Sequence, residues 1–151
     1  MAAPKEINLA QLSIEQLKSL REQLEEEVNT LSSSFSQVRA ASQRFADSKQ
    51  ALDYIKPENG GKVSLVPLTS SLYVPAQLGS TNAVLVDIGT GYYAQKTPKE
   101  AQAYMDRKMQ FLGENLEKLK QPISMKKQML EAVVSVMQMK LEQSMQQKQK
   151  S

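Results

Sequence analysis

Apolar residues recur at every seventh position along the first part of the chain, which is the pattern of a coiled-coil helix. One seam position is occupied by Leu17, Leu24, Leu31, Val38, Phe45 and Leu52. The second position is led by Ile14 and continues with Arg21, Val28, Phe35, Ser42 and Lys49. The pattern predicts a helix over residues 9–56, whose seam weakens after about residue 38 and which is ended by Pro57, Asn59, Gly60 and Gly61.

A similar pattern fills the last third of the chain. Thr97, Pro98 and Glu100 have the spacing of a capping box with proline at the first helical position, which marks a helix start. We predict a second helix over residues 98–143 and a frayed tail over 144–151, with Pro122 bending the helix near Lys118 without breaking it. Its seam holds Met105, Met109, Leu112, Leu116, Leu119, Ile123, Leu130, Val133 and Met137.

The two helices are expected to pair as an antiparallel hairpin, because their lengths are similar and their net charges are opposite. Residues 1–59 carry 7 basic and 9 acidic side chains, a net charge of −2. Residues 97–151 carry 10 basic and 6 acidic side chains, a net charge of +4. The flanks of the paired helices should therefore attract each other.

The segment between the helices predicts four short strands, because it contains five of the six glycines and is rich in β-branched and aromatic residues. The strands at 63–68, 72–77, 83–88 and 92–96 form two hairpins within residues 62–96. Pro67 and Pro75 cannot donate ladder hydrogen bonds, so the first hairpin should be an edge or bulged element. No spare helix covers the hairpins, so we expect other chains to bury them. The expected assembly residues are Val63, Leu65, Leu72, Tyr73, Val74, Val84, Val86, Ile88, Tyr92 and Tyr93.

The two outer ends of the helices carry more apolar residues than a two-helix seam can cover. In an antiparallel hairpin these surpluses meet at the end far from the strands, where methionine would suit varied partners. Extra packing within an irregular coil is the alternative, and for any single residue the sequence leaves both open. The expected binding residues at this tip are Leu9, Leu12, Leu20, Val134, Val136, Met139 and Leu141.

Composition excludes much chemistry. The chain has no cysteine, histidine or tryptophan, so zinc, haem and iron–sulfur sites and His-dependent catalysis are not expected. Gly89, Gly91 and Ala94 match a dinucleotide-binding spacing, but a strand rather than a helix follows, which favours a turn. We therefore expect no enzyme activity, cofactor or metal. Aromatic residues make up 5% of the chain, which favours elongated helices over a globular core.

Charge and apolar run length argue against nucleic acid and membrane as partners. The net charge of +3 is spread along the chain with glutamate between the basic residues, and it forms no basic stripe with stacking aromatics. Apolar runs are only a few residues long, and the N-terminal stretch lacks the apolar core of a signal peptide. The absence of cysteine favours a reducing compartment.

The strand region resembles that of α-type prefoldin subunits, through VSLVPLTSSLYVPAQL at 63–78 and VLVDIGTGYYAQKTPKEA at 84–101. With the flanking heptads, the resemblance covers nearly the whole chain. It implies an α+β fold of one domain over 1–151, with a long antiparallel coiled coil flanking two central hairpins. It also implies a hetero-hexamer with one further α-type and four β-type subunits, in which the hairpins form a double barrel.

The resemblance implies a function as well. Family members capture unfolded polypeptides, notably nascent actin and tubulin, without ATP, and they pass these clients to the cytosolic group II chaperonin. The cytoplasm is then the expected location, and the nucleus is a second one. The alternative from the residues is a coiled-coil adaptor or transcriptional regulator that binds one specific nuclear partner. A chaperone should bind many unfolded proteins with similar affinity, whereas an adaptor should bind one folded target.

Overall fold

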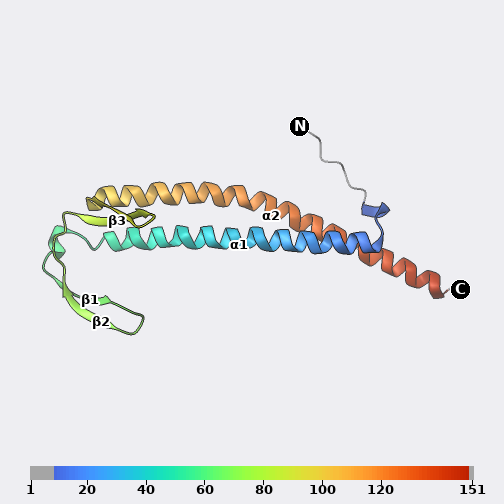
Figure 1. Cartoon of the computed structure of the whole chain (residues 1–151), viewed down its shortest axis with the longest axis horizontal. Coiled ribbons are helices and arrows are strands. Elements are labelled where there is room, and N and C mark those ends of the chain that lie inside the picture. The colour runs from blue at the N-terminus through green and yellow to red at the C-terminus, as the bar shows by residue number, and fades with distance from the viewer. Residues whose placement is uncertain (1–8, 150–151) are drawn as a thin grey trace. The chain divides into compact units, whose positions relative to one another are not determined.

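The computed structural model describes residues 9–149, and its fold class is the predicted one. Two long helices flank two small antiparallel hairpins (Figure 1). In chain order the elements are η1 (Leu9–Gln11), α1 (Ile14–Leu52), η2 (Pro57–Asn59), β1 (Val63–Pro67), β2 (Tyr73–Gln77), β3 (Val84–Gly89), β4 (Tyr92–Lys96) and α2 (Pro98–Gln149).

Helix α1 is shorter than the predicted span of 9–56 at both ends. A capping box sets its start, because the Gln16 backbone N–H donates to Ser13 Oγ over 3.1 Å and the Ser13 N–H donates to Gln16 Oε1 over 2.9 Å. Residues 9–11 instead form a single 3₁₀ turn, η1. The helix ends at Leu52, and Pro57 begins the short 3₁₀ helix η2.

Helix α2 begins at the predicted capping box and runs further than predicted. The Thr97 N–H donates to Glu100 Oε2 over 2.9 Å, and the Glu100 N–H donates to Thr97 Oγ1 over 3.3 Å. The bond from the Thr97 backbone is the main cause of the lowered pKa of Glu100. The helix continues without a break through Gly113 and Pro122 to Gln149, beyond the predicted end at 143. Residues 150–151 of the predicted tail lie outside the described residues.

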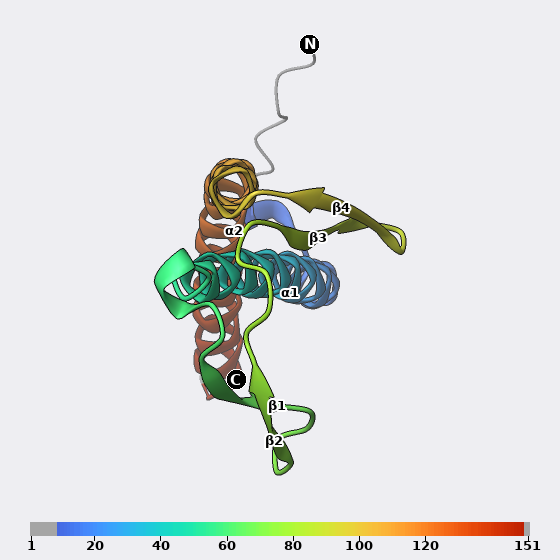
Figure 2. The same ribbon diagram turned by 90° about the vertical axis from the view of Figure 1, so that its left-hand side faces the viewer.

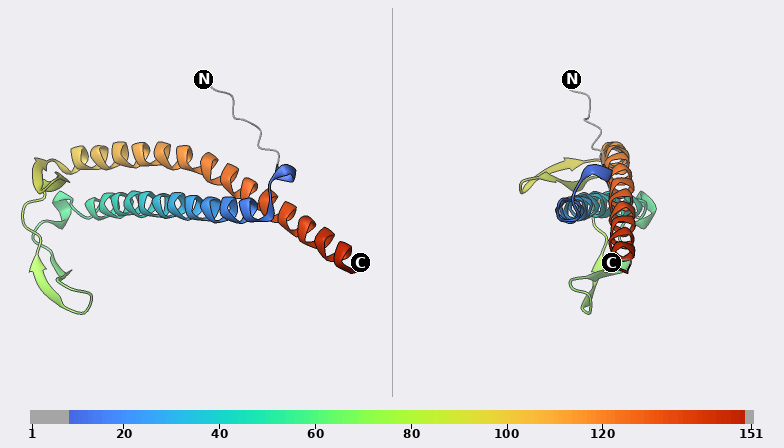
Figure 3. Two further views of the ribbon diagram at one scale, coloured as in Figure 1. Left: turned by 45° about the vertical axis from the view of Figure 1, so that its right-hand side comes forward. Right: turned by 90° about the vertical axis from the view of Figure 1, so that its right-hand side faces the viewer.

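The chain divides into two compact units, and each long helix contributes to both. We call the part formed by described residues up to Gln37 and from Asn115 onward the helix-pair unit, and residues Val38–Glu114 the hairpin unit. In the helix-pair unit, α1 and α2 run side by side (Figure 3). Its core is the cluster of buried side chains Leu17, Leu24, Val133 and Met137.

The hairpin unit contains two separate two-stranded sheets. Strands β1 and β2 pair from Val63↔Gln77 to Pro67↔Tyr73, and β3 and β4 pair from Val84↔Lys96 to Gly89↔Tyr92 with an irregular register between Asp87 and Gly89. The hairpins do not pair with each other (Figure 2). The tight β3–β4 turn needs Gly89 and Gly91, whose φ values of +110° and +79° are unfavourable for other residues.

Candidate interaction surfaces

Hairpin β1–β2 carries apolar side chains on both of its faces. Val63 and Leu65 share one face with Tyr73 on the neighbouring strand, and they are 70%, 68% and 53% exposed. Val66 and Val74 pair on the opposite face, where Val66 is also exposed and Val74 is half-buried. Since an isolated hairpin of this kind is only marginally stable in water, these faces form a surface that requires a partner.

The base of the same hairpin is closed by backbone hydrogen bonds, and one side-chain contact joins the hairpin to the segment that follows α1. The Gly61 N–H donates to the Leu78 carbonyl over 2.8 Å, and the Leu78 N–H donates to the Lys62 carbonyl over 2.9 Å. Beyond this closure, the hydroxyls of Tyr54 and Ser64 lie 2.8 Å apart and join the segment after α1 to β1. Elsewhere the strands stand apart from the helices (Figures 1 and 2). The base therefore orients the hairpin and leaves its faces open.

Hairpin β3–β4 differs, because one of its faces is covered by the chain's own helices. Val86 is only 4% exposed, and Val84 and Ala94 on the same face are half-buried. Between β3 and the helices lies a hollow of about 690 Å³, to whose lining α1 contributes Phe45 and α2 contributes Tyr104 and Met105. The opposite face and the turn are open, with exposed Leu85, Ile88, Tyr92 and Tyr93. This hairpin therefore offers one apolar face rather than two.

The predicted assembly residues are thus placed in three different environments. Those exposed are Val63, Leu65, Leu72, Tyr73, Ile88, Tyr92 and Tyr93, and those half-buried are Val74 and Val84. Val86 was predicted to contact partner subunits, but its side chain is buried. Its own unit already covers it, so it is not an open contact residue. Sequence reasoning missed Val66, Leu68 and Leu85, which are also exposed. Their signal was the apolar alternation of the strands, which marked both faces without showing which one the helices cover.

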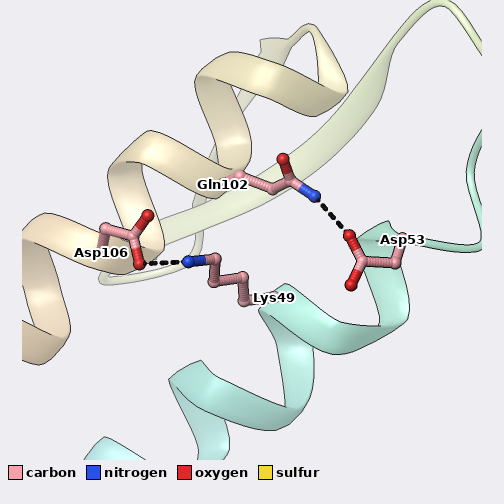
Figure 4. Close-up of polar contacts among 4 residues, drawn as sticks. All are labelled: Lys49, Asp53, Gln102 and Asp106. Atoms are coloured by element: carbon pink, nitrogen blue, oxygen red, sulfur yellow. Dashed lines mark hydrogen bonds and ion pairs between the residues drawn. The ribbon is translucent and has the colours of Figure 1, made fainter.

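Polar contacts hold the two helices together beside the hairpins (Figure 4). Lys49 Nζ lies 2.7 Å from Asp106 Oδ1, and Gln102 Nε2 donates to Asp53 Oδ1 over 2.9 Å. Lys49 occupies a seam position, so its ammonium group can reach across to α2. Both pairs join a residue near the C-terminal end of α1, Lys49 within it and Asp53 just after it, to one early in α2, which confirms the antiparallel pairing in this unit.

In the helix-pair unit, the predicted tip residues are only partly free. Four of them pack against the buried cluster: Leu9, Leu12, Leu20 and Val136. For these four, much of the side chain is used in packing within the coil, which was the alternative to a binding role. Val134 is half-buried, whereas Met139 and Leu141 are 54% and 40% exposed. The prediction missed the exposed side chains of Met125, Met129 and Met145. Met125 and Met129 each precede a seam position by one residue, and that spacing was their available signal.

Two lysines at seam positions of α2 bind polar groups across the seam, one in α1 and one just before it. The Lys126 ammonium donates to the Glu27 carboxylate, which also accepts a bond from Gln23 Nε2 over 3.1 Å. The Lys126 bond is the main cause of the lowered pKa of Glu27, and the Gln23 bond adds to it. Lys140 Nζ donates to the Leu12 carbonyl over 2.5 Å. These bonds fix which residues of the two helices face each other.

The described residues hold no group of three or more Asp, Glu, His or Cys side chains that could bind a metal ion. Nor does any described helix combine the length and the apolar character needed to cross a membrane.

The prefoldin subunit family matches residues 24–143. The chain belongs to this family. Prefoldin subunit 5 from Homo sapiens is 39% identical over 137 residues, which cover 91% of this chain and 89% of the human protein. Probable prefoldin subunit 5 from Dictyostelium discoideum is 43% identical over 136 residues, covering 90% of this chain and 84% of that protein. The Schizosaccharomyces pombe relative is 43% identical over 138 residues, with 90% of each chain covered.

A solved structure supports the prefoldin fold. The cryo-EM structure of filamentous prefoldin from Methanocaldococcus jannaschii aligns with a TM-score of 0.51 and 23% identity, covering 85% of this chain and 98% of that one. This prefoldin subunit therefore has a role in a chaperone of non-enzymatic type, and it assembles with other prefoldin subunits. Assembly gives the exposed hairpin faces a physical explanation, since partner subunits can bury them.

Proposed function

We propose that the chain is an α-type subunit of a hetero-hexamer with one further α-type and four β-type subunits, and that the complex holds unfolded polypeptides without ATP. The observation that carries the assembly part is the two-faced apolar surface of β1–β2, with Val63 and Leu65 mostly exposed. Partner hairpins would cover this surface and the open face of β3–β4. The ten predicted assembly residues are proposed to form these subunit contacts. Val86 does so indirectly, because it packs on the covered face of β3–β4 and supports that hairpin.

The proposed holding surface is the exposed apolar part of the helix-pair unit, including Met139 and Leu141. Full burial of one such side chain contributes roughly 1.5–3 kcal/mol before entropy losses, so one chain alone should bind a client weakly. Several chains in one complex raise the effective concentration of binding surface, so the complex holds while each contact exchanges quickly. Unfolded actin and tubulin are the proposed clients, because these are the clients that the family resemblance implies.

The complex is further proposed to deliver its clients to the cytosolic group II chaperonin. The proposed location of the protein is therefore the cytoplasm, with the nucleus as a second location. In this mechanism the weak individual contacts allow release when the chaperonin offers the client a larger surface. No bound nucleotide is required of this chain, since release follows from competition among weak contacts.

The test compares complexes of the full set of subunits that differ only in this chain. Met139→Ser, Leu141→Ser and Met145→Ser together should leave assembly unchanged by sedimentation velocity, because all three side chains are exposed. The same complex should need at least twofold more protein to suppress aggregation of chemically denatured actin. Lys120→Gln with Lys127→Gln is the control and should suppress as the wild type does. Unchanged suppression by the triple variant would contradict the proposed holding surface.

A further inference from the structure

A second apolar stripe runs along α2 beside the seam. It consists of Met125, Met129, Ala132, Val136 and Met139, at intervals of four, three, four and three residues. We call it the Met stripe. These intervals are those of a coiled-coil contact line, and each member lies one position before a seam position. Met125, Met129 and Met139 are exposed, so most of this line has no partner within the chain.

The Met stripe is continuous with the packed interface between the two helices. Val136 and, on α1, Leu20 both pack against the buried cluster that contains Leu17 and Val133. At its other end, Met125 and Met129 line a hollow of about 380 Å³ beside Pro122. We call the apolar surface made of Leu20 and the Met stripe the groove; its members Leu20 and Val136 already take part in the α1–α2 packing.

The edges of this groove are polar, and the hollow beside Pro122 is also lined by Lys118 and Lys126. On α2 the edges carry Gln121, Gln128 and Ser135, one turn or one residue away from stripe members. Of the two lysines, Lys126 is paired with Glu27 of α1. The apolar line between these polar edges is the feature that a partner would match.

The other side of the seam is chemically different. There a hollow of about 430 Å³ is lined by three serines and by Lys120 and Lys127, with Phe35 and Ile123 among them. The lining of this second hollow is mostly polar and contains no methionine. The two sides of the seam therefore differ in their exposed methionines, and the groove lies on the side that carries them.

The groove suits a helix better than an extended chain. Its walls are two α-helices, whose backbone groups are bonded internally and cannot pair with a neighbouring strand. An extended segment buried there would leave its own N–H and C=O groups without partners, which is costly. A helix satisfies these groups itself and can present side chains at the same four-and-three intervals. Met139 lies 14 residues after Met125, a rise of about 21 Å at 1.5 Å per residue, which matches a helix of four turns.

We propose that this groove binds an amphipathic helix, formed within an otherwise unfolded polypeptide, as a third helix packed on the α1–α2 seam. The inference rests on the proposed holding function and names the class of segment that the helix-pair unit holds. This proposal differs from the binding of any exposed apolar segment, because it requires that the apolar residues of the bound segment recur with helical periodicity.

The test uses the assembled complex and two fluorescein-labelled 18-residue peptides of identical composition. One peptide places leucine at heptad a and d positions among alanine and glutamine, and the other places the same leucines at every second residue. Fluorescence anisotropy should show at least fivefold tighter binding of the heptad peptide.

Matched variants locate the site. Met125→Gln, Met129→Gln and Met139→Gln together should weaken binding of the heptad peptide at least tenfold, whereas Lys120→Gln with Lys127→Gln should leave it unchanged. Circular dichroism and sedimentation of the variants establish that fold and assembly are retained. Unchanged binding by the folded Met variant would overturn the location of the site.

The outcomes separate this inference from the function on which it rests. Equal affinity for the two peptides would overturn the helical occupant, and the holding function would stand if suppression of actin aggregation still depended on exposed apolar residues of the helix-pair unit. Conversely, preferential binding of the heptad peptide by a complex that does not suppress aggregation would support the groove and contradict the holding function.

Discussion

The assembly surface of hairpin β1–β2 allows a quantitative prediction for the double variant Val63→Ser, Leu65→Ser. These side chains share one face of the hairpin and are 70% and 68% exposed, so the free chain gains little from them. Full burial of a valine or leucine contributes roughly 1.5–3 kcal/mol, so burying the exposed part contributes about 1–2 kcal/mol for each residue. The pair should then contribute about 2–4 kcal/mol to assembly, which corresponds to roughly 30-fold to 1,000-fold in affinity.

The assay is titration of the labelled chain with purified β-type prefoldin subunits, followed by sedimentation velocity. The double variant should retain its helical circular dichroism, because neither replaced side chain supports a helix. Its half-saturation concentration should rise by the predicted factor, while Ser70→Ala with Ser71→Ala in the adjoining turn should behave as the wild type does. If a folded double variant assembles within twofold of the wild-type affinity, partner subunits do not bury this face and the reasoning is wrong.

Three further predictions concern stability, measured on the assembled protein. Leu17→Ala should destabilise the helix-pair unit by about 2–5 kcal/mol in urea unfolding, because the side chain is fully buried, whereas the exposed Met139→Ala should change it by less than about 0.5 kcal/mol. Glu27 has a pKa lowered below its ordinary value of 4.5, chiefly by Lys126, so its stabilising contribution is complete above that value and is lost as pH falls through the lowered pKa. Glu27→Gln should therefore flatten the loss of thermal stability measured between pH 6 and pH 3. Thr97→Ala removes the cap of α2 and should cost about 0.5–2 kcal/mol in the same urea assay; a change below this range would mean that the cap bonds contribute little.

The elements were predictable because their signals are local. Heptad spacing gave both helices, and the glycines with the β-branched runs gave both hairpins. The start of α1 was also readable, since Ser13 and Gln16 have capping-box spacing, but the apolar residues from Leu9 onward extended the predicted helix too far. Apolar periodicity therefore overestimates a helix when the cap lies inside the apolar run.

The surfaces were less predictable because burial depends on contacts distant in sequence. Val86 and Leu85 are neighbours of similar character, and only the position of the helices decides that Val86 is covered and Leu85 is open. Likewise, Leu20 and Val136 lie beside the seam, where the approach of the two helices determines how much of each is buried. Val136 and Met139 of the Met stripe were predicted as tip residues, whereas Met125 and Met129 were not, because they lie outside the helix end where the apolar surplus is evident in the sequence.

The contrast between the packed helix core and the open hairpin faces has a consequence for evolution. A change in the volume of Leu17 can be compensated at Val133, because both belong to the same buried cluster of one chain. A change at Leu65 has no such internal compensation, since its side chain remains mostly exposed in its own chain. If partner subunits cover that side chain, its compensating substitution must arise in another gene. Positions 63, 65 and 73 should therefore vary together with residues of other subunits, while positions 17 and 133 should vary with each other.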